Sequence, residues 1–374
     1  MTHEPFLSVV ATSRNDNHGK NLLYRMQMFV DGFVAQCKKH DLHAELILVE
    51  WNPPNDTLPL AKALRYPQDK GPCSIRIIRV PPEAHRTLDH AESLPLFQMI
   101  GKNVGIRRAL GKFVLATNID ILFSDQLMQF MKHQLSPDSL YRVDRLDVPE
   151  ILPQTDSFDE ILKFCFQNYF RINGRIGTTL IKKNAFKEKI SKVLKKIKEV
   201  GKKTNLIKFL CFVISKIVLR LIKSPIFIYR TIRSFIKRLI CFLHPRNSLV
   251  LHTNACGDFT ILSQEGWNQL NGYPEWHMYS WHLDSILLYQ ARQQGIKHRC
   301  LPQKMPIFHI EHDLGSGYSP EGAHLLFERL KSKGIPYLSN ADLKKYTLEL
   351  KKSKATYNDD NWGMSNWDFE EVKV

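Results

Sequence analysis

Two polar residues, Asn118 and Asp120, follow an apolar run that is typical of a buried strand, Phe-Val-Leu-Ala at 113–116. Ligands of open α/β sheets bind outside the carboxyl ends of strands, and residues two apart on an extended chain point to the same side. An amide and a carboxylate placed there suit a hard divalent cation, Mn²⁺ or Mg²⁺, that itself holds a diphosphate. A polar strand end or a turn would give the same residues, so the flanking motifs decide between the two interpretations.

Three further polar groups lie at or beside the ends of other predicted strands, where they suit contacts to the base, ribose or diphosphate of a nucleotide. They are Arg14 and Asp16 after residues 6–12, Glu50 at the end of residues 45–50, and Asn103 in the helix predicted for residues 96–110. Each alone is a weak signal, because Asn and Asp are common turn residues. Their common placement at strand ends makes a chance arrangement less plausible.

The second half of the chain carries an acidic and aromatic group that suits a sugar. Asp258 follows a glycine, which lets backbone approach a ligand closely. Trp276 and Trp281 precede Asp284, and sugar faces stack on aromatic rings while a carboxylate takes a hydroxyl proton. The alternatives are core packing for the tryptophans and a helix N-terminal charge for Asp284.

The sequence His309-Ile-Glu-His312 closes a strand predicted for residues 305–310. Alternation along that strand predicts His309 and Glu311 on one face and His312 on the other. Either histidine would complete a metal site with Asp120, although a single histidine in a strand is more often structural.

Apolar runs and helical spacing alternate along the chain, which predicts a mostly parallel sheet with right-handed crossovers. The expected strands are residues 6–12, 45–50, 75–80, 112–117 and 305–310, with another strand unit at 249–263; the expected helices are residues 20–39, 96–110, 264–271 and 281–294.

The net charge of +16 belongs to one segment. Residues 181–246 hold 19 Lys/Arg and two acidic residues, whereas the remainder holds 34 basic and 35 acidic residues. No nucleic-acid-binding module is recognisable, so nucleic acid is not an expected partner. Within 186–245 two apolar stripes face lysine and arginine, with no apolar run long enough to span a bilayer. This pattern favours an anionic membrane surface; helices packed on the protein's own core, and a dimer or partner interface, stay open.

Seven scattered cysteines without a C-x-x-C pair predict reduced thiols, and the N-terminus shows no signal peptide. Together with the basic segment, these features predict a cytoplasmic protein, peripheral on the inner face of a membrane.

Taken together, the motifs resemble the GT-A fold nucleotide-sugar glycosyltransferases. Thr117-Asn-Ile-Asp120 resembles the D-x-D motif of that group with Asn118 in place of the first Asp, and Asn103-x-Gly105 resembles the A-x-N-x-G pattern of family-2-like members. The stretch Asn271-Gly-Tyr-Pro followed by Trp281-His-Leu-Asp284 resembles the acceptor motif of galactosyltransferase-type domains.

This resemblance implies roles for the candidate residues. Asp284 would be the catalytic base, and Asp120 and His309 would hold the metal. Donor binding would fall to Arg14, Asp16, Glu50, Asn103, Asn118 and Asp120, and acceptor binding to Asp258, Trp276 and Trp281. The implied domains are a GT-A domain over 1–185 and 246–350, a basic amphipathic helical insertion at 186–245, and a polar C-terminal tail at 351–374.

The expected activity is metal-dependent transfer of a sugar from a nucleoside-diphosphate sugar, by resemblance a UDP-sugar, to a glycan or lipid-linked acceptor hydroxyl, with inversion. The competing hypotheses are a non-catalytic, membrane-attached module that binds nucleotide sugars, and a protein whose basic helices dock a partner.

Overall fold

The computed structural model describes residues 4–181, 251–312, 321–350, 352 and 356–374. Contacts divide the chain into two compact units, residues 1–175 with 251–374 and residues 176–250. In the second unit, strand β9 (Gly177–Leu180) is described. The basic insertion expected at 186–245 lies outside the described residues, so its amphipathic helices stay a prediction.

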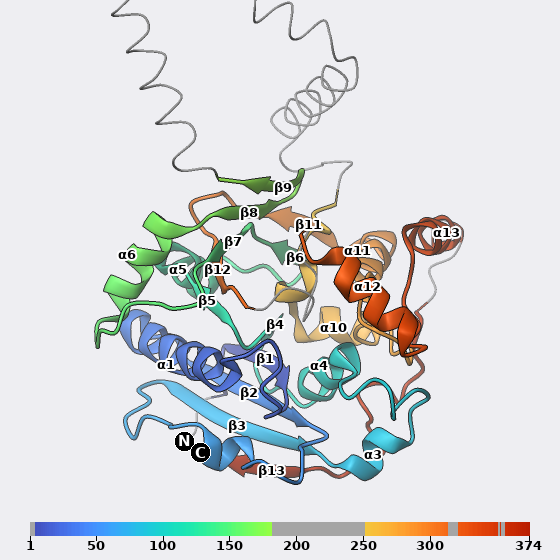
Figure 1. Cartoon of the computed structure of the whole chain (residues 1–374). Coiled ribbons are helices and arrows are strands. Elements are labelled where there is room, and N and C mark those ends of the chain that lie inside the picture. The colour runs from blue at the N-terminus through green and yellow to red at the C-terminus, as the bar shows by residue number, and fades with distance from the viewer. Residues whose placement is uncertain (1–3, 182–250, 313–320, 351, 353–355) are drawn as a thin grey trace, which may run out of the picture. The chain divides into compact units, whose positions relative to one another are not determined.

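A large sheet with the strand order β11-β6-β10-β4-β1-β2-β3-β13 forms the centre of the first unit (Figure 1). Its strands are β1 (Leu7–Ser13), β2 (Ala44–Trp51), β3 (Cys73–Val80), β4 (Phe113–Thr117), β6 (Ser139–Arg142), β10 (Phe259–Ser263), β11 (Lys297–Cys300) and β13 (Glu370–Lys373). The run β3-β2-β1-β4 is parallel throughout, and this strand order is the one in which a doubly wound sheet begins, 3-2-1-4. The prediction of an α/β fold with a Rossmann-like parallel core is confirmed.

A smaller sheet lies beside it, in the order β5-β12-β7-β8 within this unit. The strands are β5 (Ile121–Phe123), β7 (Arg145–Val148), β8 (Arg171–Gly174) and β12 (Ile307–Ile310). The predicted strand that carries His309 therefore belongs to the small sheet, where it pairs with β5 and β7.

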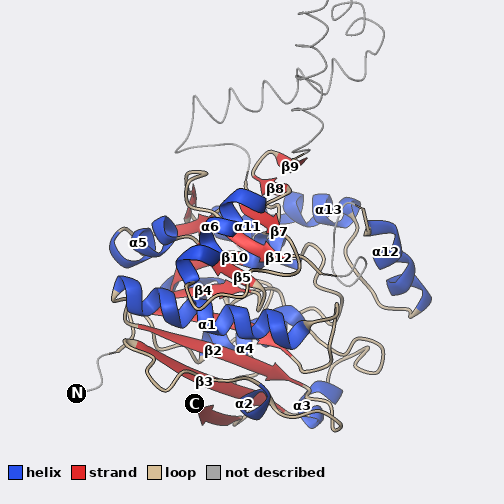
Figure 2. Ribbon diagram, turned by 60° about the vertical axis from the view of Figure 1, so that its left-hand side comes forward, coloured by secondary structure: helices blue, strands red, loops and turns tan. Residues whose placement is uncertain are grey.

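Helices cover both faces of the large sheet, and one of them, at 158–168, packs on the small sheet. They are α1 (Leu22–His40), α2 (Leu60–Ala63), α3 (Pro82–Arg86), α4 (Gln98–Arg107), α5 (Asp125–His133), α6 (Phe158–Asn168), α10 (Gln264–Leu270), α11 (Leu283–Gln293), α12 (Ala323–Ser332) and α13 (Asn340–Leu350), with a 3₁₀ turn at Cys256–Asp258. Figure 2 shows α12 and α13 on the outside of the unit, away from β2 and β3. Among the described residues, no helix is both long enough and apolar enough to cross a membrane.

Alternation along β1 sorts the core into two layers. Val9 packs in one hydrophobic cluster with α1 residues such as Phe29, and Val10 packs in the other with α4 and α11 residues such as Val104. Because β1 is covered on both faces, its sequence is an almost continuous apolar run. Burying both faces fixes the register of the strands, and with it the edge at which their polar ends meet.

Strand β10, in the strand unit expected at 249–263, is an antiparallel member of the mostly parallel sheet. It runs antiparallel to β4, with Phe259 opposite Thr117 and Ser263 opposite Phe113. The direction matters because the start of an antiparallel strand lies at the same edge as the end of its neighbour. Asp258, just before β10, therefore comes beside Asn118, just after β4.

Residues 356–374, expected as part of a polar tail, do not form a free tail. Strand β13 pairs with β3, and Trp362 is 3% exposed beneath the Arg107 guanidinium. Gly363 N–H and the Asn103 side-chain amide both donate to one oxygen of Glu275, each at 2.8 Å. The C-terminal segment is thereby fastened to α4 and to residues 271–275, where the acceptor motif was predicted.

Replacing Glu275 tests that attachment through its pH dependence. Burial raises the pKa of Glu275 from 4.5 to about 7, although Asn103 and Gly363 donate to it. Because the folded protein then holds a proton that the unfolded chain releases, the Glu275 contribution to stability is full below about pH 4.5 and is lost as pH rises to about 7. We expect Glu275→Gln to gain stability relative to the wild type over that interval, on the order of 1 kcal/mol per pKa unit.

Denaturant unfolding at pH 5 and pH 8 measures this difference. Glu328→Gln, a change on the exposed side of α12, is the control and should show no such gain. An equal effect of pH on wild type and Glu275→Gln would contradict the prediction.

Candidate functional site

Asp120, in the turn between β4 and β5, forms a compact cluster with two histidines. The Nε2 atoms of His309 and His312 lie 3.7 and 3.8 Å from Asp120 Oδ2. His309 reaches this position from β12, and His312 from the chain just after that strand. The expectation that His312 faces away from His309 is wrong, because β12 ends at Ile310 and strand alternation no longer applies.

Arg25, from helix α1, is the fourth member of the cluster. Its Nη1 donates to Asp120 Oδ2 at 2.8 Å, and its Nη2 donates to the carbonyls of His18 at 2.7 Å and Lys20 at 3.1 Å. The side chains of Arg25 and Asp120 are only 3% and 8% exposed. The loop after β1 is thus tied to the predicted metal-binding carboxylate.

The charges of the cluster stabilise one another against burial. Burial would raise the pKa of Asp120, but the positive charges of His309, His312 and Arg25 outweigh it and lower that pKa. Burial and Arg145 oppose the protonation of His309, but Asp120 and Asp147 outweigh them and raise its pKa.

These residues fit a divalent metal ion. Asp120, His309 and His312 each offer one ligand atom, and these atoms lie within 4.8 Å of one another. Asp120 Oδ1 is buried and has no hydrogen-bond partner among the described residues. An unsatisfied buried carboxylate oxygen is costly, and a cation would satisfy it.

Asn118 faces a different set of groups from Asp120. Its Oδ1 accepts from Lys102 Nζ at 2.8 Å and from Gln98 at 2.9 Å, and its Nδ2 donates to Asp258 Oδ1 at 2.5 Å. The prediction of a common side for Asn118 and Asp120 is wrong, because β4 ends at Thr117 and the chain turns between them. Here Asn118 connects α4 to the start of β10.

Lys102 lies at the centre of the predicted catalytic groups. It is fully buried and also donates to the carbonyl of Gly257 at 2.6 Å. Burial lowers the pKa of Lys102 to about 8, and the charges of Asp258, Asp284 and Asp120 work against that shift. All three carboxylates therefore lie within electrostatic range of one buried ammonium group.

Asp284 is in the first turn of α11, as predicted. Its Oδ1 accepts from the Ser285 N–H at 2.7 Å, and its Oδ2 lies so close to Gly257 that a Cβ at that glycine would come within 3.1 Å. His282, which lies two residues before Asp284 and caps α11, has a left-handed φ of 70° that non-glycine residues rarely adopt. Asp258, beyond Gly257, accepts from Arg145 Nη1 at 2.6 Å.

The residues at the ends of β1 and β2 that were predicted to bind the donor contact groups other than Asp120, His309 and His312. Arg14 pairs with Asp16 at 3.3 Å and donates to the carbonyl of Pro95 at 3.3 Å. Glu50 is buried and accepts from the Leu60 N–H at 2.7 Å, so that it holds the start of α2. Burial raises the pKa of Glu50. Nucleotide contacts by Arg14, Asp16 and Glu50 stay predictions.

Both the nitrogen and the oxygen of the Asn103 side-chain amide bind backbone groups. Its Nδ2 donates to the carbonyl of Tyr273 and its Oδ1 accepts from the N–H of the same residue, both at 2.8 Å. Gly272 has a φ of +72° and approaches so closely that a Cβ there would lie 2.5 Å from Asn103 Oδ1. These contacts give Asn103 a structural role, and donor binding by it stays a prediction.

The two predicted acceptor tryptophans are half-buried in separate aromatic groups. Trp276 packs on Tyr346 and Tyr357 with ring centroids 4.7 and 5.1 Å apart. Trp281 packs on Phe327 at 5.6 Å, near the base of α11. Both groups involve the C-terminal helices and segment that sequence reasoning left without a role.

Four site residues were missed at the sequence level: Arg25, Lys102, Arg145 and Asp147. Lys102 adjoins the Asn103 motif and could have been found there. Arg25 lies inside a helix, and Arg145 and Asp147 lie on a four-residue strand with no distinguishing pattern.

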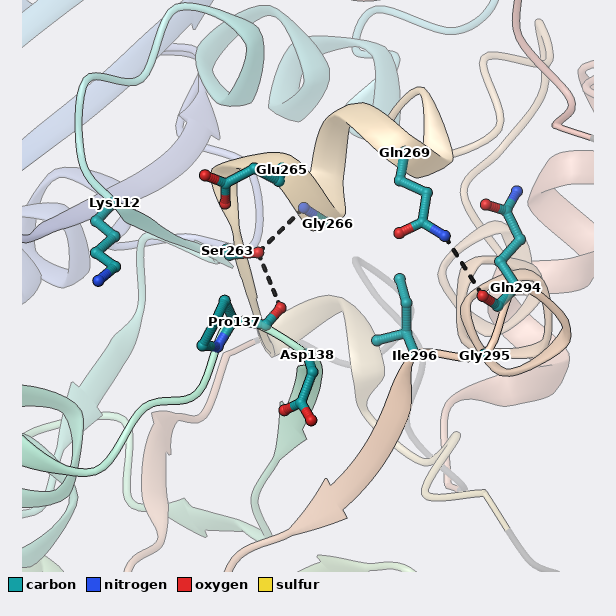
Figure 3. A pocket seen from close by; sticks show the side chains of 10 residues that line it. All are labelled: Lys112, Pro137, Asp138, Ser263, Glu265, Gly266, Gln269, Gln294, Gly295 and Ile296. Atoms are coloured by element: carbon teal, nitrogen blue, oxygen red, sulfur yellow. Dashed lines mark hydrogen bonds between the residues drawn. The ribbon is translucent and has the colours of Figure 1, made fainter.

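A groove of about 370 Å³ lies elsewhere on this unit (Figure 3). Lys112 lines it just before β4 begins, and Ser263 lines it where β10 ends, so it is at the opposite edge of the sheet from Asn118 and Asp258. Ser263 Oγ donates to the carbonyl of Pro137 and accepts from the Gly266 N–H, as Figure 3 shows. Its hydroxyl is therefore used in capping α10.

Comparison with solved structures returns matches of low sequence identity. S. aureus TarS aligns with 10% identity and a TM-score of 0.38, over 92% of this chain and 42% of that one. GalNAc-T7, determined with UDP, GalNAc and Mn²⁺, aligns with 13% identity and a TM-score of 0.41, over 97% and 56% of the two chains. The galactosyltransferase LgtC, determined with donor and acceptor sugar analogues, aligns with 16% identity and a TM-score of 0.24, over 36% and 45%.

The chain thus spans about half the length of the TarS and GalNAc-T7 chains that it matches. No protein-family model and no curated protein matches it. At such identities and TM-scores these likenesses carry no argument about activity, which we draw from the side chains alone.

Replacing Arg25 tests whether Asp120 is shared between a guanidinium and a metal ion. A unit charge about 4 Å away contributes about 4 kcal/mol at an effective dielectric constant of 20, so Arg25 opposes a cation beside Asp120. We expect Arg25→Gln to bind Mn²⁺ at least about tenfold more tightly than the wild type, measured by titration calorimetry at low salt.

Arg79→Gln, which removes a guanidinium on β3 that pairs with Glu370, is the matched control and should leave Mn²⁺ affinity unchanged. Unchanged or weaker Mn²⁺ binding by folded Arg25→Gln would show that Asp120 and Arg25 do not form the ion's site.

Proposed function

We propose that this chain is a metal-dependent glycosyltransferase that moves a sugar from a nucleoside-diphosphate sugar to an acceptor hydroxyl, with inversion at the anomeric carbon. The observation that carries the proposal is the grouping of Asp120, His309 and His312, in which Oδ1 of Asp120 has no hydrogen-bond partner among the described residues. Two further carboxylates meet at Gly257: Asp258 follows it in the chain, and Oδ2 of Asp284 lies close to it. A cation site next to two carboxylates is what diphosphate departure and hydroxyl deprotonation require.

Asp120, His309 and His312 would hold the ion. Imidazole ligands make Mn²⁺ a better match than Mg²⁺, which prefers oxygen and retains several waters. Bound there, the ion would neutralise the charge that develops on the leaving diphosphate. A UDP-sugar is the donor that we propose to test first.

Asp284 is the group that we assign to the acceptor. Its Oδ1 is held by the Ser285 N–H, which orients Oδ2 toward Gly257. From there Oδ2 would take the proton of the acceptor hydroxyl while the acceptor oxygen attacks the anomeric carbon and the diphosphate leaves. A single in-line displacement of this kind inverts the configuration. Trp281, three residues before Asp284, would pack against the acceptor sugar.

A second function has an observation in its favour. Asn118 replaces a carboxylate, and Arg25 already neutralises Asp120, so the site can hold a nucleotide diphosphate without a metal. A non-catalytic module that binds nucleotide sugars would have these features.

Donor turnover separates the two functions. We expect slow release of nucleotide from one donor in a panel of UDP-, GDP- and CMP-sugars with Mn²⁺. Asp120→Asn should reduce that release about 100-fold or more, since losing roughly 3 kcal/mol of charge stabilisation costs two factors of ten. Asp69→Asn, at an exposed ion pair with Lys38, is the control and should retain full activity.

Asp284→Asn distinguishes the two carboxylates. It should keep Mn²⁺ and nucleotide binding but lose about 10²- to 10⁴-fold in transfer to an acceptor, the usual contribution of a general base. Nucleotide binding by the wild type without turnover of any donor, even with acceptor present, would favour the binding module.

We further propose that the segment 186–245 attaches the protein to an anionic membrane surface on the cytoplasmic side, where a glycan or lipid-linked acceptor would be presented. The support is its sequence alone: clustered Lys and Arg each contribute about 1 kcal/mol near such a surface. We expect the full chain to sediment with vesicles that contain phosphatidylglycerol, less so at high salt, and not with neutral vesicles.

Replacing Lys192, Lys195 and Lys196 by Glu should reduce that sedimentation, whereas replacing Lys344, Lys345 and Lys352 outside the segment should not. Salt-insensitive association with protein in place of lipid would favour the partner-docking arm.

A further inference from the structure

Asp147 lies directly behind His309. The two residues are register partners on the parallel strands β7 and β12, so their side chains lie on the same face of the small sheet. His309 Nδ1 is 3.5 Å from Asp147 Oδ1, while His309 Nε2 is directed to Asp120 Oδ2 at 3.7 Å. One imidazole therefore connects two buried carboxylates through its two nitrogens.

The facing atoms are both buried. His309 Nδ1 has no hydrogen-bond partner within the described part of the chain, and Asp147 Oδ1 accepts no hydrogen bond there, although it forms an ion pair with Arg145 Nε at 2.8 Å. A buried donor that lacks a partner gains most by meeting an acceptor, and a carboxylate oxygen has more than one lone pair to offer. A closure of a few tenths of an ångström would make the contact a hydrogen bond.

The Asp147 carboxylate cannot turn away from His309, because its other contacts hold it. Arg145 Nε lies 2.8 Å from its Oδ1, and Arg171 Nη1 and Asn173 Nδ2 donate to its Oδ2 at 2.7 and 3.0 Å. The side chain is 0% exposed. Two guanidinium groups against one carboxylate keep it charged, so that toward His309 it can only accept a hydrogen bond.

A metal ion at Asp147 itself does not fit these contacts. Asp147, His309 and Glu311 are close enough to hold one, but Arg171 Nη1 already lies between Asp147 and Glu311, at 2.7 and 2.9 Å. The carboxylate of Asp147 therefore contacts the cluster of Asp120, His309 and His312 through His309.

We propose that Asp147 is a positioning residue that selects the tautomer of His309. By accepting a hydrogen bond from Nδ1–H, Asp147 keeps Nε2 unprotonated, and the lone pair of Nε2 then points to the space beside Asp120. Histidine ligands of metals depend on such partners for ring orientation and basicity. The proposal, which rests on the metal site of the proposed function, also makes His309 a fixed ligand of that site.

Asp147→Asn is the direct test. In this variant the amide oxygen would take the position of Oδ2, where Arg171 and Asn173 donate, so that the amide NH₂ faces His309 and favours protonation of Nε2 in place of Nδ1. We expect Mn²⁺ affinity, measured with the metal alone by calorimetry or by its electron-spin resonance, to fall about 10- to 100-fold. Glu321→Gln removes a 2.8 Å ion pair from the same Arg171 and should leave the affinity unchanged.

The tautomer can be read in the wild type, which removes any dependence on the folding of the variant. With ¹⁵N-labelled histidine at a pH where His309 is neutral, we expect the Nδ1-protonated form, with the signal assigned by its loss in His309→Gln. The Nε2-protonated form in the wild type, or wild-type Mn²⁺ affinity in folded Asp147→Asn, would overturn the proposal. Wild type that binds no Mn²⁺ would instead overturn the metal site of the proposed function, whatever the tautomer.

Discussion

The buried carboxylate of Asp120 is the group on which the rest of the candidate site depends. A charge removed from water costs several kcal/mol unless cations and donors replace its hydration. Here Arg25 approaches from α1, and two histidines approach from β12 and the chain after it. Two segments that are distant from Asp120 in sequence thus converge on one of its atoms, Oδ2, while Oδ1 is left for a ligand. The position of the loop after β1 follows from the same contact, because Arg25 also holds the carbonyls of His18 and Lys20.

Arg145 extends this compensation across the two sheets of the unit. It stands on β7 of the small sheet and pairs with Asp147 there, and it also donates to Asp258, which precedes β10 of the large sheet. Burial lowers the pKa of Arg145, but the two carboxylates outweigh it and raise that pKa, so the guanidinium is always charged. Breaking such a buried pair on one side leaves an uncompensated charge, which is more costly than the pair's net contribution. The cluster around Asp120 and the carboxylate of Asp258 are therefore fixed relative to one another.

How much the sequence could predict depends on how local each signal is. The strands that end in Ser13, Trp51 and Thr117 were predictable because burial on both faces makes them apolar runs. That Asp258 meets Asn118 was not, because it depends on β10 running antiparallel, and the direction of a strand has no signature in its own residues. Arg25 illustrates the same limit. Nothing in the sequence around this residue of α1 distinguishes an arginine on the surface from one that reaches a carboxylate 95 residues away.

The Asn103 motif shows that residues which resemble a functional motif can be required either by packing or by the chemistry of a site. Asn103 binds both backbone groups of Tyr273, Gly272 leaves room for that contact, and Glu275 joins the pair to Gly363. The residues that suggested an acceptor motif are thus required by the packing of α4 against 271–275, whatever the substrate. Its neighbour Lys102 differs, because a fully buried ammonium that binds one carbonyl and one amide oxygen satisfies no demand of the hydrophobic core. Keeping a lysine there is costly, and its closeness to Asp120, Asp258 and Asp284 gives a reason for that cost which lies in the chemistry of the site.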